Sequence, residues 1–137
     1  MRKTEQRLWD RMREALGRKL RLERIENIVN VGTADVFSLA NGRVTPVELK
    51  AVENYPARAA TRVLGDNGLS REQRNWHLSW RQNGGSSLIL VGVGSYDLFA
   101  IPGAHADFVN DMNAEELAQH AVAHSWQQLF VVLGGTR

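Results

Sequence analysis

The chain has 137 residues, of which 43% are hydrophobic and 23% are charged, a composition typical of one folded domain rather than of a disordered chain. No apolar run approaches the roughly 18 to 20 residues that span a bilayer, the basic opening segment lacks the apolar core of a signal peptide, and cysteine is absent. We therefore expect a cytoplasmic protein with no membrane partner, no disulfides and no thiolate metal site.

Positive charge is concentrated in the first part of the chain. Residues 1–81 hold sixteen of the seventeen Lys and Arg residues and ten of the fifteen acidic residues, whereas residues 82–137 hold one arginine and five acidic residues. This distribution favours a protein that binds a polyanion on one face, although solvated arginines on a helix surface would give the same count.

A helix and a strand are predicted at the start of the chain. Apolar residues recur at intervals of three and four through residues 4–20, which predicts an amphipathic helix with Thr4 as its N-cap and Gly17 near its end. The β-branched stretch 22–31 predicts a strand.

A hairpin is predicted next. Asn41 and Gly42 separate two apolar runs, and both residue types tolerate the positive φ of a tight turn, so we expect strands near 34–39 and 43–50. Pro46 has no N–H to donate, which predicts an irregular or unpaired position there.

The middle of the chain is predicted to be a long polar loop over 51–69, followed by a helix that begins at Ser70 and continues to about Gln82. Ser70 and Gln73 have the spacing of a capping box. A loop of this length in a compact domain is often functional.

The last part of the chain is predicted to contain two strands, 86–93 and 96–101, and a final helix over 114–133 capped by Asn113 with Glu116. The order of elements predicts a single α/β domain. Its expected parts are a basic N-terminal helix at 4–20, a core over about 20–101 and a C-terminal helical segment at 105–133.

Asp35, Glu48 and Lys50 form the most informative constellation. In the predicted hairpin Asp35 lies across from Glu48, and Glu48 and Lys50 point to the same face because strand side chains alternate. Two neighbouring carboxylates repel unless a cation lies between them, and Mg²⁺ accepts such ligands together with a phosphate oxygen. The residues therefore suit metal-assisted phosphodiester hydrolysis, while a surface salt bridge between Glu48 and Lys50 is the alternative.

The stretch from about Arg24 to Gly94 resembles the VRR-NUC family of the PD-(D/E)XK nuclease superfamily, especially its small stand-alone phage and bacterial members. The matching segments are "RIEN", "GTADV", "VELKAVENYPARAATRVLG" and "GLSREQRNWHLSWRQNGGSSLILVGVG". Ala34 stands where the family usually has proline, and the carboxylate that follows it is present. The resemblance implies a restriction-endonuclease-like core, with a central mixed sheet flanked by helices.

The same resemblance implies a DNA nuclease that uses Mg²⁺ or Mn²⁺. Asp35, Glu48 and the backbone carbonyl of Leu49 would bind the metal, and Lys50 would be the catalytic lysine. Gln73 would lie near the active site, and its alternative role is the cap of its own helix.

Family members also place an acidic residue upstream of the metal-binding aspartate. Glu26 in "RIEN" is our first choice for that residue, and Glu5 in the opening helix is the second. The one that is not used would be a solvated charge.

Basic and aromatic side chains near the predicted site are candidates for DNA contacts. Guanidinium groups suit phosphate, so four arginines are expected to form a basic rim, or else to be ordinary surface residues: Arg58, Arg62, Arg71 and Arg74. Trp76 and Trp80 lie four residues apart and are expected to pack on the sheet, with stacking on unpaired bases as the alternative.

For the stand-alone members the implied substrate is branched DNA, including Holliday junctions, in a bacterial or phage-infected cytoplasm. Symmetric cleavage of a four-way junction needs two active sites, which predicts a homodimer. The segment "WQQLFVVL" could form its interface or close the core. The alternatives are a less selective nuclease, either an exonuclease or a restriction-like enzyme, and a noncatalytic DNA-binding protein with the same fold.

Overall fold

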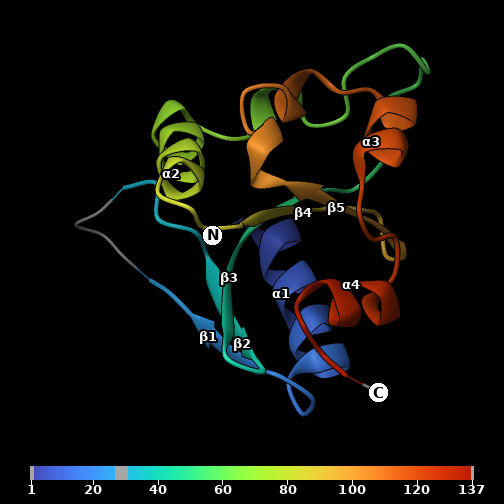
Figure 1. Cartoon of the computed structure of the whole chain (residues 1–137). Coiled ribbons are helices and arrows are strands. Elements are labelled where there is room, and N and C mark those ends of the chain that lie inside the picture. The colour runs from blue at the N-terminus through green and yellow to red at the C-terminus, as the bar shows by residue number, and fades with distance from the viewer. Residues whose placement is uncertain (1, 27–30, 137) are drawn as a thin grey trace.

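The computed structural model describes residues 2–26 and 31–136, and its centre is a five-stranded mixed sheet (Figure 1). The strands lie in chain order, and only β3 and β4 run parallel, because α2 connects them as a crossover. Their bounds are β1 Arg21–Arg24, β2 Val36–Ala40, β3 Arg43–Val52, β4 Leu88–Val93 and β5 Asp97–Pro102.

Helices cover the sheet and its edges. They are α1 Lys3–Leu16, α2 Arg71–Gln82, α3 Ala114–His120 and α4 Trp126–Val132, and three short 3-10 turns lie at Gly65–Asn67, Gly103–His105 and Val109–Asp111. In Figure 1, α1 and α4 lie below β4 and β5, and the 3-10 turns lie above them. None of the helices in the described ranges combines the length and apolar character needed to cross a bilayer.

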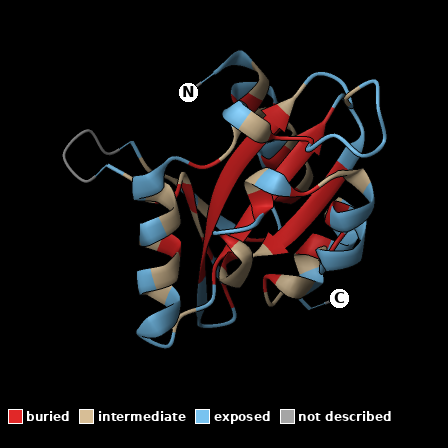
Figure 2. Ribbon diagram, turned by 90° about the horizontal axis from the view of Figure 1, so that it is seen from above, coloured by how far each residue is buried: buried red, intermediate tan, exposed pale blue. Residues whose placement is uncertain are grey.

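Each face of the sheet has its own hydrophobic core. Leu88 and Leu90 of β4 pack with α1 and α4, whereas Ile89 and Val91 pack with the turns and α3 on the other face. The continuous apolar run of β4 is therefore buried on both sides, as is usual for a parallel strand. In Figure 2 the strands are mostly buried, while α2 at the side of the sheet has a single buried residue.

The predicted hairpin is confirmed. Asn41 and Gly42 have φ values of 50° and 80°, and Ala40 pairs with Arg43 on either side of the turn. The prediction for Pro46 is wrong, because Pro46 pairs in register with Phe37. Pairing between β3 and β4 begins only at Val47, so the side of β3 that faces β4 is unpaired at the proline. The missing N–H of Pro46 therefore costs no hydrogen bond between strands.

Two predicted element ends near the N-terminus are corrected. Arg2 is the N-cap of α1 and Thr4 lies inside the helix, while Gly17 is the C-cap as expected. The strand predicted for 22–31 covers only Arg21–Arg24, and residues 27–30 of that prediction lie outside the described residues.

The predicted helix over 114–133 is two helices. Ala121 is extended at the end of α3, and Ala123 forms a bridge with Ala100 of β5. Val122 N–H donates to the Ala100 carbonyl oxygen at 2.8 Å, and Ala100 N–H donates to the Ala123 carbonyl oxygen at 2.9 Å. Ser125 then caps α4. Pairing with the sheet edge therefore replaces helical hydrogen bonds at 121–125, which periodicity within the segment does not reveal.

Candidate active site

Asp35 lies where β2 and β3 separate. The last pair of that ladder is Val36 with Val47, and beyond it the Oδ2 atom of Asp35 accepts a hydrogen bond from Leu49 N–H at 2.8 Å. The N–H and C=O of a strand residue point to the same side, so the Leu49 carbonyl also faces this opening. A carboxylate and a backbone carbonyl are thus directed into one space.

Glu48 and Lys50 face that space from β3. Val47 and Leu49 pack in the core beneath α1, so the side chains between and after them point to the opposite face of the sheet. Glu48 is fully buried and Lys50 is 8% exposed. The alternative of a surface salt bridge is therefore wrong, because neither side chain lies on the surface.

The two carboxylates strongly affect each other. Burial and the nearby Glu48 raise the pKa of Asp35 to about 8, and burial raises the pKa of Glu48 to about 7. Lys50 acts on both carboxyl groups in the opposite direction. At neutral pH the pair therefore retains a proton, and a bound cation would replace that proton and stabilise both carboxylates in their charged form.

Gln73 connects α2 to this pair. Its Oε1 accepts a hydrogen bond from Ser70 N–H at 2.9 Å and its backbone N–H donates to Ser70 Oγ at 3.2 Å, which completes the capping box. Its Nε2 donates to Glu48 Oε2 at 3.2 Å. One side chain therefore fills both roles that the sequence left as alternatives.

His77 is a member of the site that sequence reasoning did not assign. It is fully buried, its Nε2 lies 3.3 Å from Glu48 Oε1, and its Nδ1 lies 2.7 Å from Ser87 Oγ. Burial lowers the pKa of His77 to about 4, so the imidazole is neutral and its contact with Glu48 is a hydrogen bond rather than an ion pair. The available signal was its spacing of four from Gln73, which places both on one face of α2.

The upstream acidic residue at the cluster is Glu5. It is 8% exposed in the first turn of α1, and its charge raises the pKa of Glu48. Its Oε2 accepts no hydrogen bond in the described structure and lies 3.6 Å from a guanidinium nitrogen of Arg2. Glu26, our first choice, is instead exposed and pairs with Arg24 at 3.5 Å, so the structure does not bring it into the buried cluster.

The donor set fits a hard divalent cation. Within the described ranges, no group of three or more His, Asp or Glu side chains is already arranged around a metal position. Mg²⁺, however, needs only one or two carboxylates and completes its shell with water and phosphate oxygens. This chemistry is provided by the half-buried Asp35 and the buried Glu48, both with raised pKa, by a facing carbonyl and by the Glu5 oxygen that accepts no hydrogen bond from the described residues.

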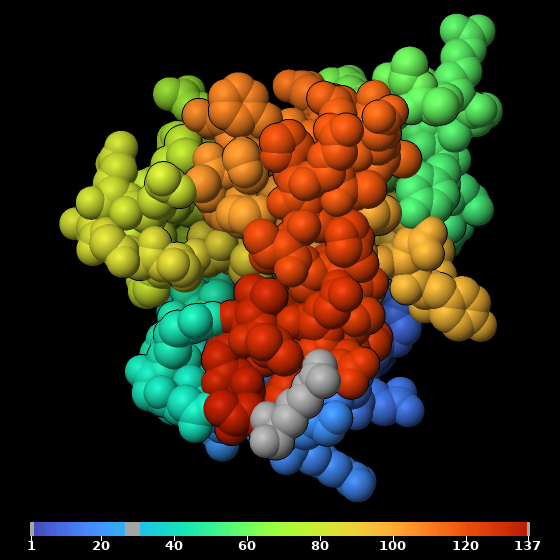
Figure 3. All heavy atoms as spheres, turned by 45° about the vertical axis from the view of Figure 1, so that its right-hand side comes forward, coloured from blue at the N-terminus to red at the C-terminus, as the bar shows by residue number. Residues whose placement is uncertain are grey.

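The four arginines proposed as a rim do not lie together. The loop with Arg58 and Arg62 projects at the upper right of Figures 1 and 3, away from α2 at the left, which carries Arg71 and Arg74. Arg62 pairs with Asp66 and Asp111 at 3.6 and 3.7 Å.

The two arginines of α2 also differ from each other. Arg71 is two residues from Gln73 and so lies on another side of the helix, whereas Arg74 is half-buried and its guanidinium is 3.4 Å from the Leu69 carbonyl oxygen.

The aromatic residues of α2 pack as expected. The rings of Trp76 and Trp80 stack with centroids 5.1 Å apart, and Phe37 of β2 contacts both edge-on. This cluster fastens α2 to the sheet beside the site and orients the face that carries Gln73 and His77.

Comparison of the structure with known structures identifies the fold. It is similar to Hjc, a Holliday junction resolvase from the archaeal hyperthermophile Archaeoglobus fulgidus, with a TM-score of 0.52, 12% identity and 75% of each chain covered. The chain has the restriction-endonuclease-like α/β fold. No protein-family model matches the chain, and no curated protein matches its sequence. The VRR-NUC resemblance therefore stays a prediction, whereas the fold that it implied is confirmed.

Proposed function

We propose that the protein is a divalent-metal-dependent DNA endonuclease that cleaves branched DNA such as Holliday junctions. The observation that carries the proposal is the group formed by half-buried Asp35 with buried Glu48 and Lys50 at the separation of β2 and β3. A module that only binds DNA has no need to place two carboxylates with raised pKa together beside a buried lysine. Similarity to the fold of a junction resolvase supports the choice of DNA as substrate.

Mg²⁺ or Mn²⁺ would be held by Asp35, Glu48 and the Leu49 carbonyl, with Glu5 beside them. When bound, the ion would polarise the phosphoryl group and make water a better nucleophile. Glu5 replaces Glu26 in this proposal, because its carboxylate is buried and one of its oxygens accepts no hydrogen bond in the described structure.

The remaining groups of the site act on the phosphate and on Glu48. The Lys50 ammonium would orient the attacking water and offset negative charge as the bond from phosphorus to the leaving oxygen breaks. Gln73 and His77 each hydrogen-bond one oxygen of Glu48, which fixes the direction of that carboxylate.

Symmetric cleavage of a four-way junction would use two copies of the chain. The segment "WQQLFVVL" contributes partly to the core, because Leu129 and Leu133 are buried with α1, while Val131 remains exposed. We therefore propose a homodimer in which this exposed side of α4 is available to the partner.

Cleavage by point variants tests the proposed site. We expect Asp35→Asn and Lys50→Ala to lower the cleavage rate of a labelled four-way junction by at least about 100-fold in Mg²⁺, while circular dichroism and junction binding stay close to those of the parent protein. Glu5→Gln should reduce cleavage strongly, and Glu26→Gln is the matched control that should not. Undiminished cleavage by purified Lys50→Ala would remove Lys50 from the mechanism.

A further inference from the structure

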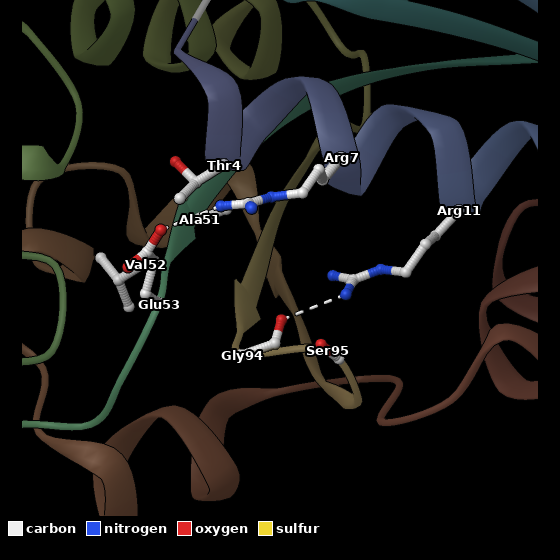
Figure 4. Close-up of a pocket in the computed structure, with 8 residues that line it drawn as sticks. All are labelled: Thr4, Arg7, Arg11, Ala51, Val52, Glu53, Gly94 and Ser95. Atoms are coloured by element: carbon white, nitrogen blue, oxygen red, sulfur yellow. Dashed lines mark hydrogen bonds and ion pairs between the residues drawn. The ribbon is translucent and has the colours of Figure 1, made fainter.

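A basic site lies beside the first half of α1, separate from the proposed metal-binding cluster. It is a pocket of about 220 Å³ between α1 and the ends of β3 and β4, and we call it the basic pocket (Figure 4). Its lining includes Arg7 and Arg11 from α1, the hydroxyl-bearing Thr4 and Ser95, and Glu53 and Gly94 at the strand ends.

The two arginines point into this space together. They are one helical turn apart, and Figure 4 shows both side chains reaching from α1 toward the strand ends. Arg7 Nη2 lies 3.0 Å from Glu53 Oε1, and Arg11 Nη1 donates to the Gly94 carbonyl at 3.1 Å. Each contact uses only part of a guanidinium group that has five N–H donors.

Electrostatics favour an anion between these groups. Burial and the charge of Arg7 lower the pKa of Arg11. The two guanidinium groups therefore repel each other, and an anion between them would relieve that repulsion. Glu53 offsets part of the charge, but its side chain is 67% exposed and can turn into solvent. Guanidinium groups with nearby hydroxyls are typical contacts of phosphate oxygens.

The basic pocket and the proposed active site draw residues from the same two elements. Thr4 directly precedes Glu5 on α1, and Ala51, which lines the pocket, directly follows Lys50 on β3. Neighbouring strand residues lie only a few ångströms apart although their side chains point to opposite faces, so a DNA substrate bound at Lys50 is large enough to extend to this pocket.

We propose that the basic pocket binds a backbone phosphate of the DNA substrate other than the cleaved one. Arg7 and Arg11 hold this phosphate, which competes with Glu53 for Arg7. This inference rests on the proposed function and adds a phosphate site that is separate from the metal-binding cluster. In the free protein Glu53 forms an ion pair with Arg7, and the DNA phosphate takes the place of Glu53 when DNA binds.

Binding of a fluorescein-labelled four-way junction, measured by anisotropy from 50 to 300 mM salt in EDTA and in Ca²⁺, tests the inference. The double variant Arg7→Ala/Arg11→Ala should bind roughly tenfold more weakly, and its slope of log affinity against log salt should be smaller by about one. The control Arg13→Ala/Arg18→Ala removes two charges from the same region outside the pocket and should leave the slope unchanged.

Glu53→Gln gives an independent test in the opposite direction. It should tighten binding in the parent protein but not in an Arg7→Ala background, whereas Glu14→Gln, which removes a charge elsewhere on α1, should have little effect in either. Equal slopes for the two arginine double variants, or a Glu53→Gln effect that persists without Arg7, would overturn the phosphate site and leave the proposed nuclease intact. Absence of DNA binding by the parent protein would overturn both.

Discussion

Asp35 and Glu48 are acidic residues whose ionised forms are disfavoured by burial. Glu48 is fully buried, and Asp35 receives one backbone hydrogen bond from Leu49. The folded-state pKa of each lies above its ordinary value, at about 8 and about 7. Such carboxyl groups bind protons more tightly in the folded chain than in the unfolded chain, so they favour folding at low pH and oppose it at high pH.

This linkage predicts how the metal-free protein responds to pH. The contribution of Asp35 to stability is complete below pH 4 and is lost as the pH rises to about 8. In EDTA, the melting temperature of Asp35→Asn relative to the parent protein should therefore rise between pH 5.5 and pH 9. The control Asp107→Asn, at an exposed site, should show no such trend. If the melting temperatures of Asp35→Asn and the parent protein differ by the same amount across this range, the raised pKa of Asp35 is contradicted.

His77 carries a second prediction at this scale. If it fixes Glu48 for the metal, His77→Ala should weaken Mn²⁺ binding by roughly 10-fold or more, and Ser87→Ala should weaken it less because the imidazole remains. Calorimetric titration with Mn²⁺ measures this without turnover, and His77→Gln should recover part of the affinity. Unchanged Mn²⁺ affinity in folded His77→Ala and Ser87→Ala proteins would leave His77 a packing residue.

Sequence reasoning identified the central residues but not all of their neighbours. Asp35, Glu48 and Lys50 could be found because a hairpin and strand alternation place them together. Glu26 was ranked above Glu5, an order that the structure does not support, because nearness to the cluster depends on how α1 packs against β3. Glu5 did carry a signal, since it lies on the same helical stripe as the buried Leu8.

At the scale of elements, β3 and α2 position most of the site. β3 supplies Glu48 and Lys50, and α2 returns the chain to the sheet so that Gln73 and His77 meet Glu48. The N-terminal cap of α2 is therefore part of the support of the site.

Variants of this cap separate stability from activity. Ser70→Ala removes the acceptor of Gln73 N–H and should cost about 1 kcal/mol of unfolding free energy, while the Gln73 contact with Glu48 stays in place. Gln73→Ala keeps that backbone hydrogen bond but removes the acceptor of Ser70 N–H and the contact with Glu48, so it should also reduce the single-turnover cleavage rate more than tenfold. Urea unfolding and rate measurements on both proteins provide the comparison, and an equal loss of rate would contradict the second role of Gln73.

The elements that could be predicted are those whose signals are local. The turn at Asn41 and Gly42 and the capping box of α2 need only neighbouring residues. The division of the C-terminal segment into α3 and α4 depends on Ala123 meeting Ala100 of β5, a contact that the segment alone cannot encode. Pro46 was misjudged because the starting point of the β4 ladder was not known.

At the scale of the whole molecule, the positive charge is not one rim around the site. Arg58 and Arg62 lie on a loop away from α2, and Arg7 and Arg11 line a pocket beside the start of α1. A substrate with strands that diverge could contact such separate basic regions, which agrees with the proposed preference for branched DNA.

The most direct test of the central claim is cleavage by the purified protein of end-labelled linear duplex, 5′-flap and four-way junction DNA in Mg²⁺, Mn²⁺ or EDTA. The account predicts paired symmetric cuts in the junction, produced by a dimer and absent in EDTA. Cleavage of all three substrates would retain the nuclease but contradict its specificity for branched DNA. Binding without any cleavage in either metal would contradict the assignment of Asp35, Glu48 and Lys50 as a catalytic site.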